Sequence, residues 1–294
     1  MKVGAHISTE GNYKKMAAYA QKVGCECIQI FSKSPRQWKA KPMPLHKREE
    51  LAAARSVYDF GPVLTHTAYL LNVTTNDEAM AEKSVEALAD ELVRASILQA
   101  EGVVLHPGNV PDDDIDAATL RAARAIERSF ALADESCKDL GIECSSRLLL
   151  ENTAGAGKLF GSTITQLCNV IKETKVPSKR LGICFDTCHG WAAGYDVSTQ
   201  AGWDEVLKEL IDAGDLSMWH FAHANDCKFA RGSHMDRHAW IGEGEIGFEG
   251  FKILMHLGDA HPSLVDMCVI TEMPGEIPEK DIINIEALKA LRVD

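Results

Sequence analysis

The sequence predicts an α/β fold, a (β/α)₈ TIM barrel with a parallel eight-stranded core and its active site at the C-terminal face of the strands. Eight short apolar, β-branched segments alternate with segments of helical periodicity, which is typical of this barrel. Continuous apolar runs of this length suit parallel strands that are buried on both faces. A doubly wound open sheet is the alternative, but no G-x-G-x-x-G phosphate loop follows the first predicted strand.

The alternation of strand and helix patterns runs through the whole chain. The predicted strands are residues 2–7, 27–32, 62–66, 102–106, 147–152, 181–186, 218–223 and 267–272. A chain of 294 residues suits one large barrel, so we expect a single domain over residues 1–294.

The predicted helices lie between these strands and carry apolar residues on one face. One helix has Asn76 as its predicted N-cap, and its apolar face is Val85, Leu88, Leu92 and Ala95. The apolar face of the next helix is Leu120, Ala123, Ile126, Phe130 and Ala133. Later helices are predicted to begin near Thr163, Thr199 and Gly247, and the last to cover residues 283–291.

The composition is that of an ordinary soluble protein, with 46% hydrophobic and 25% charged residues. No apolar run approaches the roughly 20 residues of a membrane span, and nine scattered cysteines fit buried thiols in a reducing compartment. We therefore expect a cytoplasmic protein (nucleoid-associated, or nuclear in a eukaryote) that is monomeric and does not contact membranes. The net charge of −12 argues against non-specific coating of nucleic acid, but allows a nucleic-acid enzyme with a local cationic face.

Six consecutive predicted strands end in side chains that commonly bind metal ions. These are His66, His106, Glu151, Asp186, His223 and Glu272. His189 lies just beyond the sixth strand, and Asp236 and His238 lie in the loop after the seventh. Each residue alone has a structural explanation, since Asp186 could cap a helix, for example. The barrel, however, places its catalytic groups at these strand ends, so the repeated pattern favours a metal centre.

The nine candidate ligands are five His, two Asp and two Glu. Four or five ligands fill one zinc site, so nine suit two or three ions if a carboxylate bridges. The high share of His favours zinc over magnesium, which prefers oxygen ligands. Clustered divalent ions, about 3.5–4 Å apart, suit the hydrolysis of phosphodiesters.

Ten motifs extend this pattern along nearly the whole chain. They are GAHIS (4–8), FSKSPRQW (31–38), HTAYLLN (66–72), HPG (106–108), ENTAGAG (151–157), DTCHGWAAGYD (186–196), HANDCK (223–228), GSHMDRH (232–238), IGEGEIG (241–247) and TEMP (271–274). With these motifs the chain resembles the endonuclease IV family of abasic-site DNA repair endonucleases. The combination of DTCH, AAGYD, DRH and IGEG is highly specific for that family.

The resemblance implies three zinc ions per chain and an assignment of their ligands. His66 and His106 would bind one ion, and Glu151 would bridge it to a second that is completed by Asp186, His223 and Glu272. His189, Asp236 and His238 would hold the third. Asn225, Asp226 and Glu243 are expected to orient the imidazoles.

The implied reaction belongs to base excision repair. It is hydrolysis of the phosphodiester 5′ to an abasic site in duplex DNA, which leaves a 3′-hydroxyl and a 5′-deoxyribose phosphate. Glu151, beside the attacking hydroxide, would be the catalytic residue.

An abasic nucleotide lacks stacking and is easily flipped out of the duplex. By resemblance, Arg36, Tyr69 and Leu70 would insert into the gap and hold the bent DNA. Trp38 beside them is equally well explained as an aromatic packed at the base of its loop. Three lysines of the same loop, Lys33, Lys39 and Lys41, are expected to form a basic strip that contacts phosphates.

Two other functions fit the candidate site residues less well. A metal-dependent sugar isomerase of related architecture places two metal ions among His, Glu and Asp at the strand ends. It has no use for a third ligand set or for inserting residues. A non-catalytic protein that binds damaged DNA would not need nine intact ligands.

Overall fold

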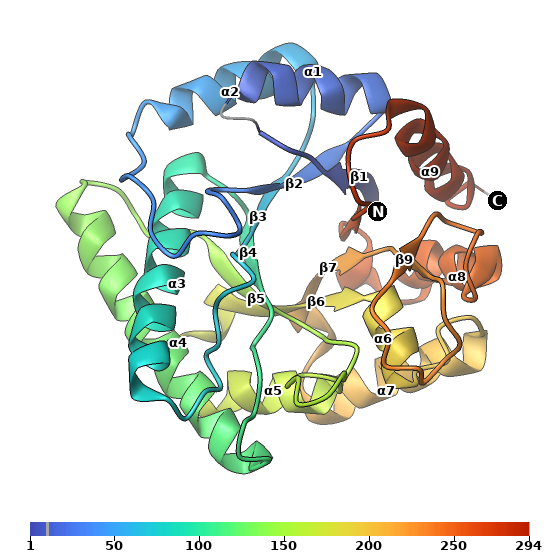
Figure 1. The fold of residues 1–294 in the computed structure, drawn as a ribbon. Coiled ribbons are helices and arrows are strands. Elements are labelled where there is room, and N and C mark those ends of the chain that lie inside the picture. The colour runs from blue at the N-terminus through green and yellow to red at the C-terminus, as the bar shows by residue number, and fades with distance from the viewer. Residues whose placement is uncertain (10–11, 294) are drawn as a thin grey trace.

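The computed structural model describes residues 1–9 and 12–293, and its centre is a closed barrel of parallel strands surrounded by helices (Figure 1). The barrel strands are β1 (Lys2–His6), β2 (Cys27–Phe31), β3 (Val63–His66), β4 (Gly102–Leu105), β5 (Arg147–Glu151), β6 (Leu181–Asp186), β7 (Trp219–His223) and β10 (Cys268–Thr271). Neighbouring strands follow the chain order, and β10 closes the ring against β1. The predicted fold class is therefore confirmed.

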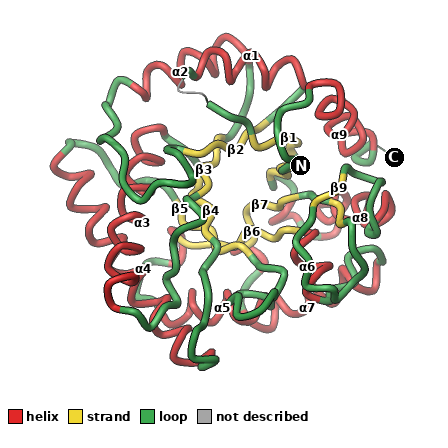
Figure 2. The backbone as a smooth tube through the Cα atoms, viewed as in Figure 1, coloured by secondary structure: helices red, strands yellow, loops and turns green. Residues whose placement is uncertain are grey.

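The helices form the outer ring, which Figure 2 shows around the strands. They are α1 (Tyr13–Val23), α2 (Lys47–Tyr58), α3 (Glu78–Leu98), α4 (Ile115–Asp139), α5 (Ile164–Glu173), α6 (Thr187–Ala193), α7 (Gln200–Ala213), α8 (Gly247–Ala260) and α9 (Pro278–Ala290). A short ribbon of β8 (Asp226–Cys227) and β9 (His238–Ala239) follows β7. In the described part of the chain, no helix has the length and apolar character to cross a membrane.

The sequence-based boundaries agree with the structure to within one residue at both ends of every barrel strand. The helices differ more. The N-cap of α3 is Asp77, not Asn76, because the Asp77 carboxylate accepts the bond from the Met80 N–H. Leu120 is 42% exposed, and the buried face of α4 runs through the adjacent Thr119 instead. The last helix begins at Pro278, whose fixed φ suits a first turn.

The interior of the barrel has an apolar layer with a polar layer above it. Eight buried side chains form the apolar cluster: Cys27, Leu64, Val104, Leu149, Cys184, Phe221, Cys268 and Ile270. Side chains of a strand alternate between its two faces, so the residue two positions further along points to the same side. Six residues of this cluster are followed at that spacing by the strand-end ligands, as Leu149 is by Glu151. The strand pattern thus places the polar side chains together at one end of the barrel.

Candidate metal centre

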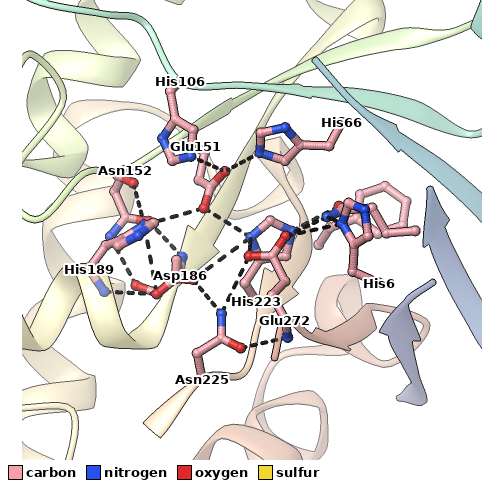
Figure 3. A network of polar contacts seen from close by, with 12 residues as sticks. His6, His66, His106, Glu151, Asn152, Asp186, His189, His223, Asn225 and Glu272 are labelled. Atoms are coloured by element: carbon pink, nitrogen blue, oxygen red, sulfur yellow. Dashed lines mark hydrogen bonds and ion pairs between the residues drawn. The ribbon is translucent and has the colours of Figure 1, made fainter. Parts of the chain in front are cut away.

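The strand-end side chains converge on the carboxylate of Glu151, which is fully buried (Figure 3). The Nε2 atoms of His66 and His106 both lie 3.2 Å from Glu151 Oε2. On the other oxygen, His223 Nδ1 lies 2.9 Å from Glu151 Oε1. One carboxylate therefore faces two groups of imidazoles, as a bridging ligand must.

The second group surrounds His223. Its Nδ1 lies 3.2 Å from Glu272 Oε2 and 3.8 Å from Asp186 Oδ2. The ligand atoms of these three residues and Glu151 all lie within 4.8 Å of one another, and so do those of Glu151, His66 and His106. Each group is compact enough for one ion.

The third group combines α6 with the β8–β9 ribbon. Asp236 places its two oxygens 3.3 Å from His189 Nε2 and 3.3 Å from His238 Nε2. Unlike the other eight ligands, the Asp236 side chain is largely open to solvent, at 52%. The three groups coincide with the three sets that the sequence motifs imply. Cys188 forms a further group with Asp186 and His238, which was not expected from the sequence.

Three of the five imidazoles are oriented as metal ligands commonly are, since one ring nitrogen donates a hydrogen bond to a backbone carbonyl and the other faces carboxylates. His66 Nδ1 donates to the Thr67 carbonyl at 2.8 Å. His189 Nδ1 donates to the Asn152 carbonyl at 3.0 Å. His238 Nδ1 donates to the Glu272 carbonyl at 2.7 Å. The remaining Nε2 of His238 is buried, and although it lies 3.3 Å from Asp236 Oδ1 it makes no hydrogen bond among the described residues, so the donor set fits a metal ion.

The charges of the site stabilise one another. Burial would raise the pKa of Glu151, but the neighbouring His106 and His223 hold it well below its usual range. Burial opposes protonation of His223, yet the surrounding acidic groups raise its pKa well above normal. His106 has weaker compensation, and burial lowers its pKa to about 4. A divalent cation would supply the same positive charge without requiring protonated imidazoles.

Asp186 has two tasks. Its Oδ1 accepts the N–H of His189 at 2.7 Å and so caps α6. Its Oδ2 lies in the second ligand group and accepts from Asn225 Nδ2 at 2.6 Å. The structural explanation of this residue is therefore confirmed, and the cap fixes where His189 points. The role of Asp186 as a metal ligand stays a prediction.

A cavity of about 770 Å³ opens beside the second group. Its walls include His6, Tyr69, His238 and Glu272, together with residues 32–35 of the loop after β2. The loops after β2 and β3 therefore share this cavity with His238 and Glu272 of the candidate metal centre. It is large enough for part of an extended polar substrate.

Known proteins are similar to this chain in both sequence and fold. A family model described as a xylose isomerase-like TIM barrel matches residues 17–288. The protein named "Probable endonuclease 4" in Methanoculleus marisnigri is 39% identical over 289 residues, covering 98% of both chains. The crystal structure of endonuclease IV from Thermus thermophilus is similar at a TM-score of 0.82 with 32% identity, covering 99% of this chain and 98% of that one.

The chain belongs to the endonuclease IV family. A D-tagatose 3-epimerase-like protein also has a similar structure, at a TM-score of 0.71 with 21% identity over 99% of this chain and 97% of that one. At that identity the likeness concerns the fold alone.

The three residues expected to insert into DNA lie on the loops that follow β2 and β3, at the C-terminal face of the barrel. Arg36 is exposed, Leu70 is half-buried, and Tyr69 is 65% exposed. The Tyr69 ring lies 5.6 Å from the His66 ring, centroid to centroid. Their position suits a role in DNA binding, which stays a prediction.

The prediction of a basic strip on this loop is wrong for Lys33. The Lys33 side chain is only 2% exposed, and its ammonium lies 2.7 Å from Asp90 Oδ2. Lys39 is exposed but pairs with Glu86 at 3.2 Å. Trp38 packs against the core, which supports the structural explanation of that residue.

The residues that orient the ligands were only partly found from the sequence. Asn225 holds one candidate ligand by its side chain and another by its backbone, since its Nδ2 donates to Asp186 Oδ2 at 2.6 Å and its Oδ1 accepts the backbone N–H of Glu272 at 2.7 Å. Asp226 instead accepts backbone N–H groups of residues 242, 244 and 246, and so shapes their loop. Glu243 lies exposed on that loop, away from the role expected for it.

Gln29 was not predicted as a site residue, although it lies two residues after Cys27 and therefore points to the same inner side of β2. It is fully buried. Its Oε1 accepts from His223 Nε2 at 2.9 Å, and its Nε2 donates to Glu272 Oε1 at 2.6 Å. Strand alternation, applied to polar residues of every type, would have identified it. Gln29 therefore holds two ligands of the second group at once.

Replacing Gln29 with Leu, which has a similar volume but no amide, should weaken binding of zinc by about 10–100-fold. The reason is that His223 and Glu272 would lose the group that orients them. Competition with a chromogenic chelator measures the change. Gln37→Leu, at an exposed glutamine, is the matched control. Equal zinc affinity in both variants would contradict the role of Gln29.

Proposed function

We propose that this protein hydrolyses the phosphodiester 5′ to abasic sites in duplex DNA, with three zinc ions held by nine side chains. Family membership makes the protein a DNA-cleaving hydrolase. The observation that carries the finer proposal is that two ligand groups share Glu151 and the third contacts it through His189. The products would be a 3′-hydroxyl and a 5′-deoxyribose phosphate.

Each ligand group would hold one ion. His66 and His106 would share Glu151 with the second group, and His189 Nδ1, 3.3 Å from Glu151 Oε1, joins the third group to the same carboxylate. Clustered divalent ions activate water and take up charge on the phosphodiester oxygens. Five imidazoles among nine ligands favour zinc over magnesium.

The chain's own groups would position the substrate. Glu151 is held from both sides by imidazoles, so its carboxylate stays fixed and ionised at the reacting centre. The adjoining cavity would receive the flipped abasic nucleotide. Tyr69, Leu70 and Arg36 on the neighbouring loops would fill the space left in the duplex.

A sugar isomerase is the second candidate, because an epimerase-like protein has a similar fold. Two ligand groups would suffice for it. The third group of His189, Asp236 and His238, and the exposed Tyr69 beside the cavity, would have no use in such a reaction.

The zinc-loaded protein should cleave a duplex that contains one abasic site and leave the matched intact duplex uncut. Product analysis on a denaturing gel should give a 3′-hydroxyl end. An aldose assay under the same conditions serves as the comparison. Isomerisation of the sugar with no cut in the abasic duplex would overturn the proposed function.

Glu151→Gln should lower the cleavage rate by more than about a hundredfold, the upper end of what loss of an outer-shell partner costs a metal site. A neutral amide cannot bridge two cations as a carboxylate does. DNA binding, measured by fluorescence anisotropy, should be largely kept. Glu143→Gln, at an exposed glutamate on the opposite end of the barrel, should behave as the wild type. A fully active Glu151→Gln variant would rule out the bridging role.

Elemental analysis should find close to three zinc ions per chain, and His238→Ala should reduce the number by one, because the third group would lose a ligand. His46→Ala, at a histidine whose side chain is 65% exposed, provides the control. About one zinc per chain in the wild type would exclude the three-ion centre.

A further inference from the structure

The loop between β2 and α2, residues 32–46, contains no helix or strand. It carries Arg36 at an exposed turn in which the Gln37 N–H bonds to the Ser34 carbonyl at 3.2 Å. Long loops without secondary structure are commonly functional and often mobile. The contacts that order this loop are therefore relevant to any role of Arg36 in DNA binding.

A buried ion cluster joins the start of the loop to α3. The Lys33 ammonium lies 2.7 Å from Asp90 Oδ2 and 3.6 Å from Glu91 Oε1. The Ser32 hydroxyl donates to Glu91 Oε2 at 2.5 Å. Both Lys33 and Glu91 have almost no exposed side-chain surface. A lysine buried in this way needs its acidic partners, because an unpaired charge in the interior is strongly unfavourable.

The same helix also holds the far side of the loop. Arg94 Nε donates to both oxygens of Asp90 at 2.9 Å. Its Nη2 donates to the backbone carbonyl of Lys41. The Lys33 ammonium also donates to the Trp38 carbonyl at 3.4 Å. Contacts therefore lie on both sides of the Arg36 turn, at residues 32–33 and at residues 38–41.

Consecutive turns of one rigid helix thus carry both attachment points. In Figure 1 the segment that follows β2 passes beside α3 before it enters α2. Only the turn between the attachment points stays free of the cluster, and Pro35 within it has a restricted φ. The loop is ordered by charge pairs that include none of the nine candidate metal ligands.

We propose that Asp90, Glu91 and Arg94 are positioning residues that hold the β2–α2 loop, and with it Arg36, in its DNA-binding shape before DNA arrives. The inference rests on the proposed function. A loop that is already ordered loses less conformational freedom on binding, so the affinity for the abasic duplex is higher. The cluster acts on binding and leaves the chemistry at the metal centre unchanged.

Asp90→Asn tests the proposal, because it removes the charge that Lys33 and Arg94 share. We expect the KM for an abasic duplex to rise roughly tenfold while kcat and the zinc content stay at the wild-type values. In the free protein, amide hydrogen exchange over residues 33–41 should become faster. The matched control is Glu86→Gln, which breaks the exposed Lys39–Glu86 pair between the same loop and the same helix. It should change neither the KM nor the rate of hydrogen exchange.

Arg94→Met is the second variant, to be used also if Asp90→Asn does not fold. It removes the contact with the Lys41 carbonyl and leaves the Lys33–Asp90 pair, so we expect faster exchange at residues 38–41 only. Unchanged KM and exchange in both variants would overturn the positioning role, and so would a lower kcat at constant KM. Because exchange is measured without DNA, failure of the wild type to cut abasic DNA would count against the proposed function alone.

Discussion

The burial of one carboxylate, Glu151, is the constraint on which the rest of the site depends. A charged group without exposed surface must be surrounded by compensating charge or hydrogen bonds. His66, His106 and His223 provide that compensation from three different strands. These side chains can meet only because the barrel is closed, since β3 and β7 lie on opposite sides of it. The fold thus creates the site by bringing distant strand ends to one point.

The register of a single strand pair decides whether this arrangement works. Between β6 and β7, Ile183 pairs with Trp219, but the next residue, Cys184, pairs with Phe221, so that His220 is extra. A bulge of this kind shifts every later side chain of its strand to the other face. It turns Phe221 into the apolar layer and His223 toward Asp186. Without it, His223 would point at the helices, and the second ligand group would lose its only imidazole.

The sequence predicted the barrel strands and the strand-end positions of six candidate ligands well, because both follow from a period of two residues. The division of the candidate ligands into three groups came from the family resemblance instead. It failed where the deciding partner lies elsewhere in the chain. Lys33 looked like a surface cation, yet its partners are Asp90 and Glu91 on α3. Gln29 looked like an ordinary strand residue, although it bonds two ligands from β7 and the end of β10. Local patterns report which face a side chain occupies, whereas its partner across the barrel depends on closure.

The three ligand groups differ in how firmly the chain holds them. Those around Glu151 and His223 come from barrel strands and lie on a packed apolar layer. Asp236 lies in the exposed loop between β8 and β9, and among the described residues its carboxylate forms ion pairs only with the imidazoles that it would join to a metal ion. The ribbon is ordered by Asp226, which gathers three backbone N–H groups of the following loop. The positions of Asp236 and His238 therefore depend on loop contacts, whereas His189 is fixed by the Asp186 cap and the other two groups by the barrel.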